Sequence, residues 1–138
     1  MCGVPVRAKR KQYDVEVERS GRATADGDSP LDLDDAWTPE HLVLFALARC
    51  TLSALDHHAR RASIRVSAGA TAGGAVSERA DGSWGFVDVE CRLDVDLDPV
   101  PDDDHLSDLL RSTERGCFVG ASLDPEPTYH WRVNGADR

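Results

Sequence analysis

The feature that most constrains this sequence is an apolar run over residues 42–55, LVLFALARCTLSAL, in which apolar residues occupy almost every helical face. A surface helix carries one apolar stripe, whereas a helix that is apolar all round is buried on most sides. The preceding residues 37–40 (WTPE) indicate the helix start, because Thr38 suits the capping position and Pro39 the first helical turn. The pattern ends near residues 60–61. In so short a chain, such a helix predicts that a second subunit helps to cover it.

Short strands are predicted on both sides of this helix. Residues 12–19 alternate apolar and polar side chains, which is typical of a half-buried strand. Two further short strands are expected around residues 22–26 and 31–33. The clearest strand runs from residue 84 to 97, and its apolar residues all fall on one face. They are Val87, Val89, Cys91, Leu93, Val95 and Leu97.

The remaining segments complete an α+β pattern. Residues 63–80 alternate weakly and lead to an Asp81-Gly82 turn signal. Three carboxylates at 102–104 start a second helix over about 104–115, and residues 128–133 form a closing strand. The order of strands and helices is that of an α+β protein rather than of alternating βαβ units. We expect one domain over residues 12–138, preceded by a flexible N-terminal arm at residues 1–11.

Charge and hydropathy exclude several kinds of partner. The net charge of −9 argues against nucleic acid, because phosphate binding needs a basic face. No stretch approaches the ~20 apolar residues that span a bilayer, so a membrane is not an expected partner. The N-terminal residues lack the apolar segment of a secretory signal. These observations predict a cytoplasmic protein.

Four cysteines, at 2, 50, 91 and 117, lie far apart, without a CxxC motif or zinc-finger spacing. Cys91, on the inward face of its strand, is predicted to be a core residue. Cys50 is either a core cysteine or a reactive thiol. Burial raises the pKa of a thiol, so a reactive Cys50 needs a nearby cation. Cys117 lies at a helix end, where it either packs as a core residue or approaches another thiol.

Metal and cofactor sites are not expected. Adjacent His57 and His58 point apart on a helix, and spacing places no third ligand beside them or His130. The carboxylates at 102–104 lack calcium-loop spacing.

Residues 38–50 (TPEHLVLFALARC) resemble the hallmark of the OsmC/Ohr family of thiol proteins: a polar-Pro-Glu entry, an apolar helix, and a cysteine ten residues after the glutamate. A second cysteine after another helix, Cys117, and the order of elements from residue 13 to 135 also fit. The resemblance implies an OsmC-like fold, with antiparallel sheets around a long buried central helix. It also implies an intertwined homodimer with active sites at the interface.

The resemblance further implies a thiol-dependent hydroperoxide reductase that protects against oxidative stress. Cys50 matches the cysteine that attacks the hydroperoxide, and Cys117 the cysteine that resolves the resulting sulfenic acid as a disulfide. An external dithiol is the expected reductant, and no cofactor is implied. Glu40 matches an acidic residue that orients an arginine, and Arg22 matches that arginine.

Physical chemistry supports a role for such an arginine. The thiolate is the nucleophile, and a guanidinium within ~4–6 Å favours it. Ten residues of continuous helix span ~15 Å, so Glu40 cannot contact Cys50 directly. A bridging arginine or a non-helical start to the segment is required. Arg49, which precedes Cys50 where the family has a small residue, is either a surrogate cation or an outward-facing helix residue.

A substrate pocket at the dimer interface is expected to include Phe45, Phe118 and Trp37. Phe118 stands where peroxidatic members of the family have proline after the second cysteine. Two other hypotheses are open. One is a non-enzymatic OsmC-fold protein that binds an apolar or acyl ligand, with Cys50 as a core residue. The other is a structural stress protein with neither a reactive thiol nor a pocket.

Overall fold

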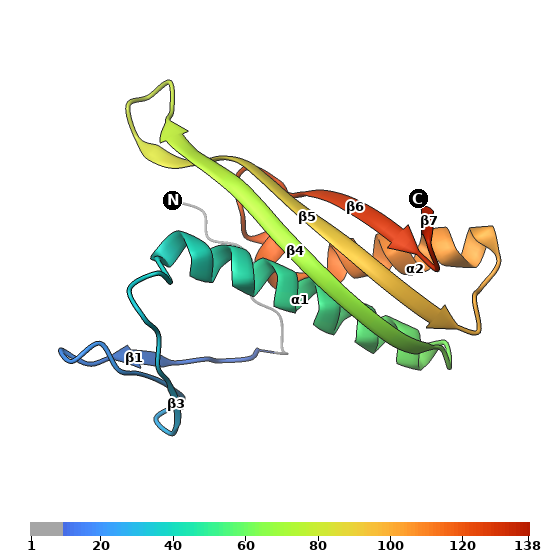
Figure 1. The fold of residues 1–138 in the computed structure, drawn as a ribbon, viewed down its shortest axis with the longest axis horizontal. Helices are drawn as coiled ribbons and strands as arrows, with labels where there is room; N and C mark the ends of the chain where they lie inside the picture. Colours follow the sequence, from blue (N-terminus) through green and yellow to red (C-terminus); the bar gives the residue numbers. More distant parts are fainter. Residues whose placement is uncertain (1–9) are drawn as a thin grey trace. The chain divides into compact units, whose positions relative to one another are not determined.

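The computed structural model describes residues 10–138, which form two compact units, one ending at Thr38 and the other spanning Pro39–Arg138. Cys2 and most of the arm predicted at residues 1–11 lie outside the described residues. The α+β class is confirmed, since helices and two sheets make up the chain (Figure 1). The single domain over residues 12–138 stays a prediction.

The N-terminal unit contains a three-stranded antiparallel sheet. Its strands are β1 (Val15–Val17), β2 (Ala23–Ala25) and β3 (Ser29–Leu31). The third strand begins earlier than the predicted 31–33. Asp26 and Gly27 both adopt positive φ angles, 51° and 78°, and this tight turn brings Ser29 opposite the end of β2. Turns of this kind favour Asp-Gly, because most other residues are strained at positive φ.

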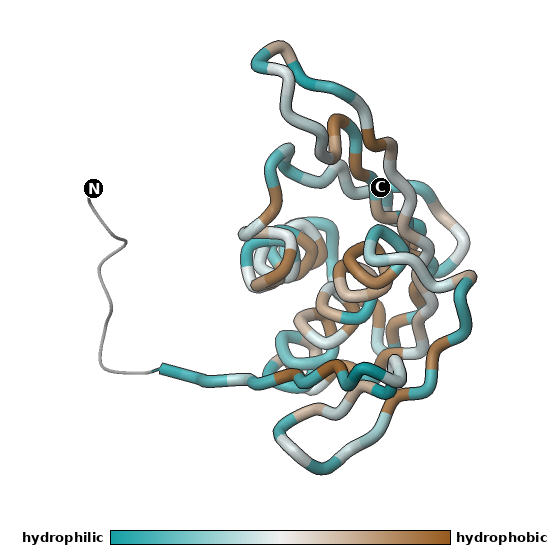
Figure 2. The backbone as a smooth tube through the Cα atoms, turned by 90° about the vertical axis from the view of Figure 1, so that its left-hand side faces the viewer, coloured by the Kyte–Doolittle hydropathy of each residue, from teal (hydrophilic) through white to brown (hydrophobic). Residues whose placement is uncertain are grey.

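The C-terminal unit combines a four-stranded sheet with three helices. Its elements are α1 (Pro39–Arg61), β4 (Arg65–Glu78), β5 (Trp84–Asp98), α2 (Asp103–Gly116), α3 (Phe118–Ala121), β6 (Thr128–Val133) and β7 (Ala136–Asp137). The sheet order is β4-β5-β6-β7, and α1 and α2 lie against each other on one face of the sheet (Figures 1 and 2). Apolar segments recur along both helices in Figure 2.

One strand pair differs from the expected antiparallel arrangement. β5 and β6 are parallel, whereas the other neighbouring strands of this sheet are antiparallel. The chain leaves the end of β5 and crosses back through α2 and α3 before β6 begins. Such a crossover connection returns the chain in the same direction, so the pair must be parallel.

The core lies between the sheet and the helices. Alternate residues of β5 from Val89 to Leu97 are buried there, as predicted, together with Leu47 and Leu55 of α1. Val87 is the exception and is 45% exposed. The β4–β5 register shifts between Ala75 and Val76, which leaves Val87 as an extra residue on β5. A bulge of this kind breaks the two-residue alternation, so the prediction for Val87 was wrong.

Helix α1 begins and ends as predicted, and within the single chain it is buried along one side, while the covering of its other sides by a second subunit stays a prediction. Its buried residues form one stripe: Leu47, Thr51, Ala54, Leu55 and Ala59. Phe45, on another side of the helix, is 50% exposed. The sheet and α2 cover only part of a cylinder with 3.6 residues per turn. Within residues 10–138, none of the helices combines the length and apolarity needed to cross a bilayer.

Candidate thiol site

Helix α1 and the junction between α2 and α3 bring two thiols together. Cys50 projects from α1, and Cys117 lies between the two later helices, where it caps the N-terminus of α3. The side chains of these two cysteines are in hydrogen-bonding contact. Cys50 is partly exposed, whereas Cys117 is fully buried. The fold therefore places Cys117 beside another thiol, and its resolving role stays a prediction.

The sulfur of Cys117 is surrounded by hydrogen-bond donors. The Gly120 amide donates to Cys117 Sγ at 3.3 Å, and Thr51 Oγ1 lies 3.4 Å from the same sulfur. The Thr51 hydroxyl is also 2.8 Å from the Leu47 carbonyl oxygen, one turn earlier in α1. The hydroxyl of Tyr129, on β6, also forms a hydrogen bond with Cys117. Polar groups thus converge on this sulfur inside an otherwise apolar core.

The pKa of Cys50 lies above its ordinary value. Burial is the largest cause, and the neighbouring thiol of Cys117 raises the pKa further. The backbone of Val119 and Phe118 lowers it in part, through hydrogen bonds to the sulfur. Among the described residues, the groups with the largest effect on this pKa do not include an arginine. The C-terminal unit therefore supplies backbone dipoles to Cys50, and the predicted cation has to come from elsewhere.

Cys91 is a core residue, as predicted. It is fully buried on β5 and lies opposite Tyr129 of β6 in the strand register. Burial raises the pKa of Cys91 to about 11, although a hydrogen bond from Thr51 acts in the other direction. A thiol with such a pKa is almost entirely protonated at neutral pH, so Cys91 is a poor nucleophile.

The predicted acid and arginine lie in different units. Glu40 is exposed in the first turn of α1, which is helical from Pro39 through Cys50. The alternative of a non-helical start is therefore wrong, and direct contact between Glu40 and Cys50 is excluded by helix geometry. Arg22 is exposed in the N-terminal unit, just before β2. The roles of Glu40 and Arg22 stay predictions.

The aromatic residues assigned to a substrate pocket are also divided between the units. Phe45 on α1 and Phe118 at the start of α3 are 50% and 64% exposed. Trp37 belongs to the N-terminal unit. Arg49 is exposed, which agrees with an outward-facing helix residue. Across residues 10–138, no group of three or more His, Cys, Asp and Glu side chains is arranged to hold a metal.

Sequence reasoning did not identify Thr51 or Tyr129. Thr51 carried a usable signal, because it is a polar residue directly after Cys50 in an apolar helix. Tyr129 carried no such signal, because the sequence around it does not indicate that its side chain lies near Cys117. The tyrosine also accounts for the glycine at position 120, because a Cβ there would lie only 2.3 Å from the Tyr129 hydroxyl oxygen.

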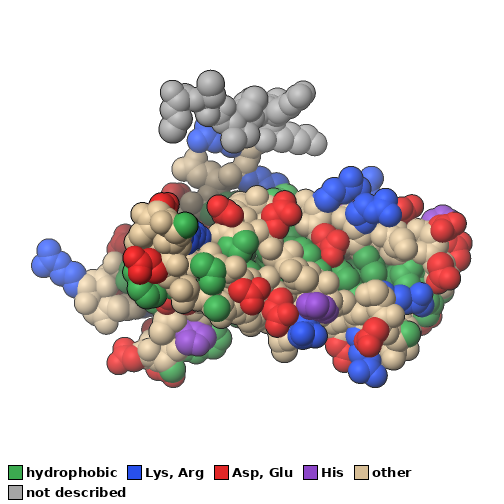
Figure 3. Space-filling model, turned by 90° about the horizontal axis from the view of Figure 1, so that it is seen from above, with side chains coloured by type: hydrophobic (Ala, Val, Ile, Leu, Met, Phe, Trp, Pro, Cys, Tyr) green, Lys and Arg blue, Asp and Glu red, His purple; other side chains and the backbone are tan. Residues whose placement is uncertain are grey.

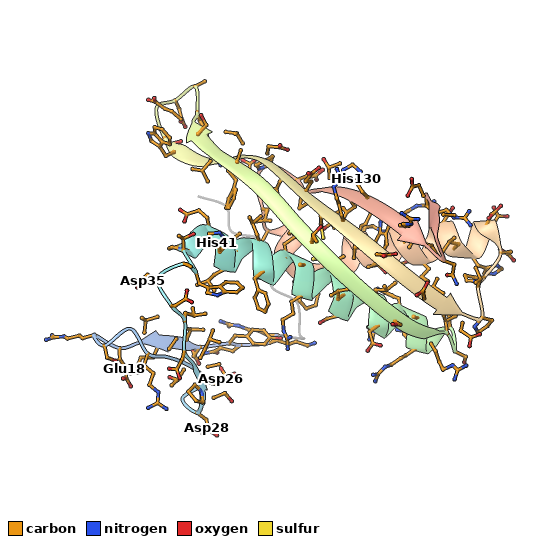
Figure 4. All side chains as sticks on the ribbon, in the orientation of Figure 1. Glu18, Asp26, Asp28, Asp35, His41 and His130 are labelled. Carbon is orange, nitrogen blue, oxygen red and sulfur yellow. The ribbon has the colours of Figure 1, made fainter. Side chains whose placement is uncertain are left out.

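A large pocket lies away from these thiols. Its volume is about 710 Å³, and its lining includes Arg92 and His130 of the sheet. Figure 4 labels His130 on β6. Glu90 lies 3.5 Å from Arg92 and 3.3 Å from His130, so opposite charges are paired on this face. Acidic and basic side chains are likewise interspersed on the face shown in Figure 3. These charges are those of a solvated sheet surface.

A thiol on a long helix and a second thiol at the junction of two later helices, beside a mixed sheet, define an α+β thiol protein. The chain matches the family model described as OsmC-like protein over residues 32–132. It therefore belongs to the OsmC-like family, and the predicted OsmC-like fold is confirmed. No curated protein sequence matches the chain.

Solved structures agree on the fold. An OsmC-like protein of unknown function from Vibrio cholerae has a TM-score of 0.70, with 16% identity over 90% of this chain and 99% of that one. An organic hydroperoxide resistance protein from Elizabethkingia anophelis has a TM-score of 0.66, with 16% identity over 92% and 98%. An OsmC-like protein from Mycoplasma pneumoniae has a TM-score of 0.64, with 16% identity over 93% and 98%.

Proposed function

We propose that this chain is a thiol-dependent hydroperoxide reductase that acts against oxidative stress in the cytoplasm. The observation that carries the proposal is the contact between a partly exposed thiol, Cys50, and a buried one, Cys117. Membership of the OsmC-like family supports it, and similar folds occur in proteins named for organic hydroperoxide resistance.

The proposed reaction uses both cysteines in order. The Cys50 thiolate attacks a peroxide oxygen, the O–O bond breaks, and an alcohol or water leaves after taking a proton. Cys50 is then a sulfenic acid. The Cys117 thiol attacks that sulfur, water leaves, and a Cys50–Cys117 disulfide forms. An external dithiol returns both cysteines to thiols and is itself oxidised to a disulfide.

This chemistry requires a positive charge beside Cys50, because burial raises the pKa of that thiol. We assign this role to Arg22, steadied by Glu40. An arginine stays protonated even when partly buried. Its planar guanidinium can donate hydrogen bonds to a carboxylate and to a peroxide at the same time. The arginine would come from the N-terminal unit of one or the other subunit.

A homodimer is part of the proposal. None of the described residues of the N-terminal unit is buried, although several have large apolar side chains. Those exposed by 45% or more are Tyr13, Val15, Val17, Leu31 and Trp37. Small sheets of this kind need a covering surface for stability, and a contiguous exposed apolar patch marks an interaction site. A second subunit would cover them and would enclose a substrate pocket including Phe45, Phe118 and Trp37.

One observation favours a different function. The raised pKa of Cys50 is typical of an inert core thiol. It supports an OsmC-fold protein that binds an apolar or acyl ligand and does no thiol chemistry. A thiol titration of the assembled protein separates the two functions. A Cys50 pKa below the ordinary ~8.5 supports the reductase, and a pKa above it supports the binding protein.

The direct test is peroxide consumption with dithiothreitol as reductant. Cys50→Ser is expected to reduce the rate at least about 100-fold, because the nucleophile is lost. Cys91→Ser is the matched control and should retain the activity, since that cysteine is a core residue. Activity of Cys50→Ser equal to that of the wild type would end the proposal.

A second measurement addresses Cys117. After a brief hydroperoxide pulse, mass spectrometry should find a disulfide between Cys50 and Cys117. Sulfinic acid on Cys50 without that disulfide would show that Cys117 does not resolve.

A further inference from the structure

The two thiols of the site differ in their surroundings. Cys117 is fully buried, and its sulfur meets the Gly120 amide at 3.3 Å and the Thr51 hydroxyl at 3.4 Å. Cys50 is partly exposed and meets mainly backbone of α3. An external thiol can therefore reach the sulfur of Cys50 far more easily than that of Cys117.

The hydroxyl of Tyr129 and the sulfur of Cys117 both lie beside Gly120. Burial and the neighbouring sulfur raise the pKa of Tyr129, so its hydroxyl keeps its proton. The position of this hydroxyl depends on Gly120, because a Cβ there would lie 2.3 Å from Tyr129 Oη and 3.4 Å from Cys117 Sγ. The glycine therefore lets the tyrosine hydroxyl and the buried sulfur occupy neighbouring positions.

We propose that Thr51 and Tyr129 are positioning residues that stabilise reduced Cys117, the sulfur that leaves when the Cys50–Cys117 disulfide is reduced. The inference rests on the disulfide of the proposed function. Thr51 comes from α1 and Tyr129 from β6, so two separate elements fix the sulfur. Neither residue contacts the peroxide in this scheme.

The step proceeds by thiol–disulfide exchange. A thiolate of the external dithiol attacks Cys50 Sγ, the S–S bond breaks, and its electron pair moves to Cys117 Sγ, which then takes up a proton. The second thiol of the dithiol attacks the mixed disulfide and frees Cys50. The protein disulfide gains two electrons, and the dithiol becomes a cyclic disulfide.

Both access and charge favour this direction. Exchange depends on which sulfur is reached and on how well the leaving sulfur carries negative charge. The Gly120 amide stabilises such charge on Cys117, and the Thr51 hydroxyl does so by turning its single proton from the Leu47 carbonyl oxygen to the sulfur. They also interact more strongly with a thiol or thiolate than with a disulfide sulfur, so they stabilise the reduced protein.

The first test is Thr51→Val, which keeps the side-chain shape and removes the hydroxyl. Thr113→Val is a close control. Thr113 is equally buried, and its hydroxyl bonds the Leu109 carbonyl one turn earlier, as Thr51 bonds Leu47. The readout is the equilibrium of the disulfide, formed with diamide, in mixtures of reduced and oxidised dithiothreitol. We expect Thr51→Val to shift this equilibrium roughly three- to tenfold toward the disulfide, and Thr113→Val to leave it unchanged.

The second test is Tyr129→Phe, with the exposed Tyr13→Phe as its matched control. Tyr129→Phe should shift the equilibrium in the same direction by a similar factor, and a tenfold shift corresponds to ~30 mV. Gly120→Ala should do so too, because the added methyl displaces the tyrosine hydroxyl. In the double variant Gly120→Ala/Tyr129→Phe, the shift should not exceed that of Tyr129→Phe alone.

These outcomes separate the inference from the proposed function. If hydroperoxide fails to oxidise Cys50 but the diamide-formed disulfide shows the expected shifts, the inference holds and the peroxidase proposal fails. If peroxide turnover is normal and both Thr51→Val and Tyr129→Phe leave the equilibrium at its wild-type value, the inference is overturned. Equal shifts in Thr51→Val and Thr113→Val would also overturn it, because they would reflect general packing.

Discussion

The two units of the chain differ in what they bury. The C-terminal unit encloses a core in which Leu47, Leu55, Val95 and Cys117 are fully buried. The N-terminal unit has strands of three residues each, and its large apolar side chains are exposed. The C-terminal unit has the interior that a stable domain requires, and the described part of the N-terminal unit does not. The thiol site lies in the C-terminal unit, and the arginine assigned to it lies in the N-terminal unit.

The largest expected effect tests the core of the C-terminal unit. Leu55→Ala removes a fully buried side chain from α1 and should lower the free energy of unfolding by about 2–5 kcal/mol. Urea denaturation at one protein concentration measures it. Leu31→Ala, at a position 51% exposed, is the counterpart in the N-terminal unit and should cost less than about 1 kcal/mol. Equal losses would show that the two units share one core.

The next prediction tests the exposed face of β1. Val15→Asp/Val17→Asp places two charges on one face of this strand, because alternate residues share a face. If a second subunit covers that face, association should weaken by at least about tenfold, since unpaired charges are costly to bury. Sedimentation at several concentrations measures it. Glu16→Gln, on the opposite face, is the control, and unchanged association of the double variant would contradict the proposed interface.

A smaller effect concerns a polar contact at the edge of the core. Trp131 Nε1 donates to Glu114 Oε1 at 3.2 Å, which ties β6 to α2. Glu114→Ala should lower the free energy of unfolding by about 1 kcal/mol, because it leaves a largely buried donor without its acceptor. Thermal unfolding measures the change. The exposed Glu16→Ala in the N-terminal unit should lower the free energy of unfolding by less. An equal decrease would contradict the view that only the C-terminal unit holds a polar contact of this kind.

The smallest effect is a pH dependence at the start of α2. Asp102 accepts from the His105 amide at 2.9 Å, and its carboxylate contacts the imidazole. The Asp102 carboxylate raises the pKa of His105 above 6.5, and the hydrogen bond from the His105 amide, with that of the imidazole, lowers the pKa of Asp102 below 3.8. The pair therefore contributes most between pH 3.8 and 6.5. The contribution is lost as pH rises through the pKa of His105 or falls through that of Asp102.

A proton NMR titration of His105 measures this shift. Asp102→Asn keeps a capping side chain and removes the charge, so the His105 midpoint should return toward 6.5. A midpoint that does not move would show that Asp102 is not the cause.

The sequence by itself determined the elements whose signals are local. Capping and proline chemistry placed the start of α1, and the closing strand was predicted at its observed bounds, Thr128–Val133. The parallel β5–β6 pair and the bulge at Val87 were missed, because a crossover and a register shift depend on how strands pair.

The candidate site divides in the same way. The sequence identified Cys50 and Cys117 as candidate thiols from their settings in and after a helix, and the resemblance assigned a role to each. The contact between them, and the donors Thr51 and Tyr129 around the second sulfur, arise from α1, the α2–α3 junction and β6 packing together. Residues so far apart along the chain carry no local pattern that relates them. Only the tertiary structure decided which polar groups the buried sulfur meets, because burial brings together side chains whose sequence separation is unconstrained.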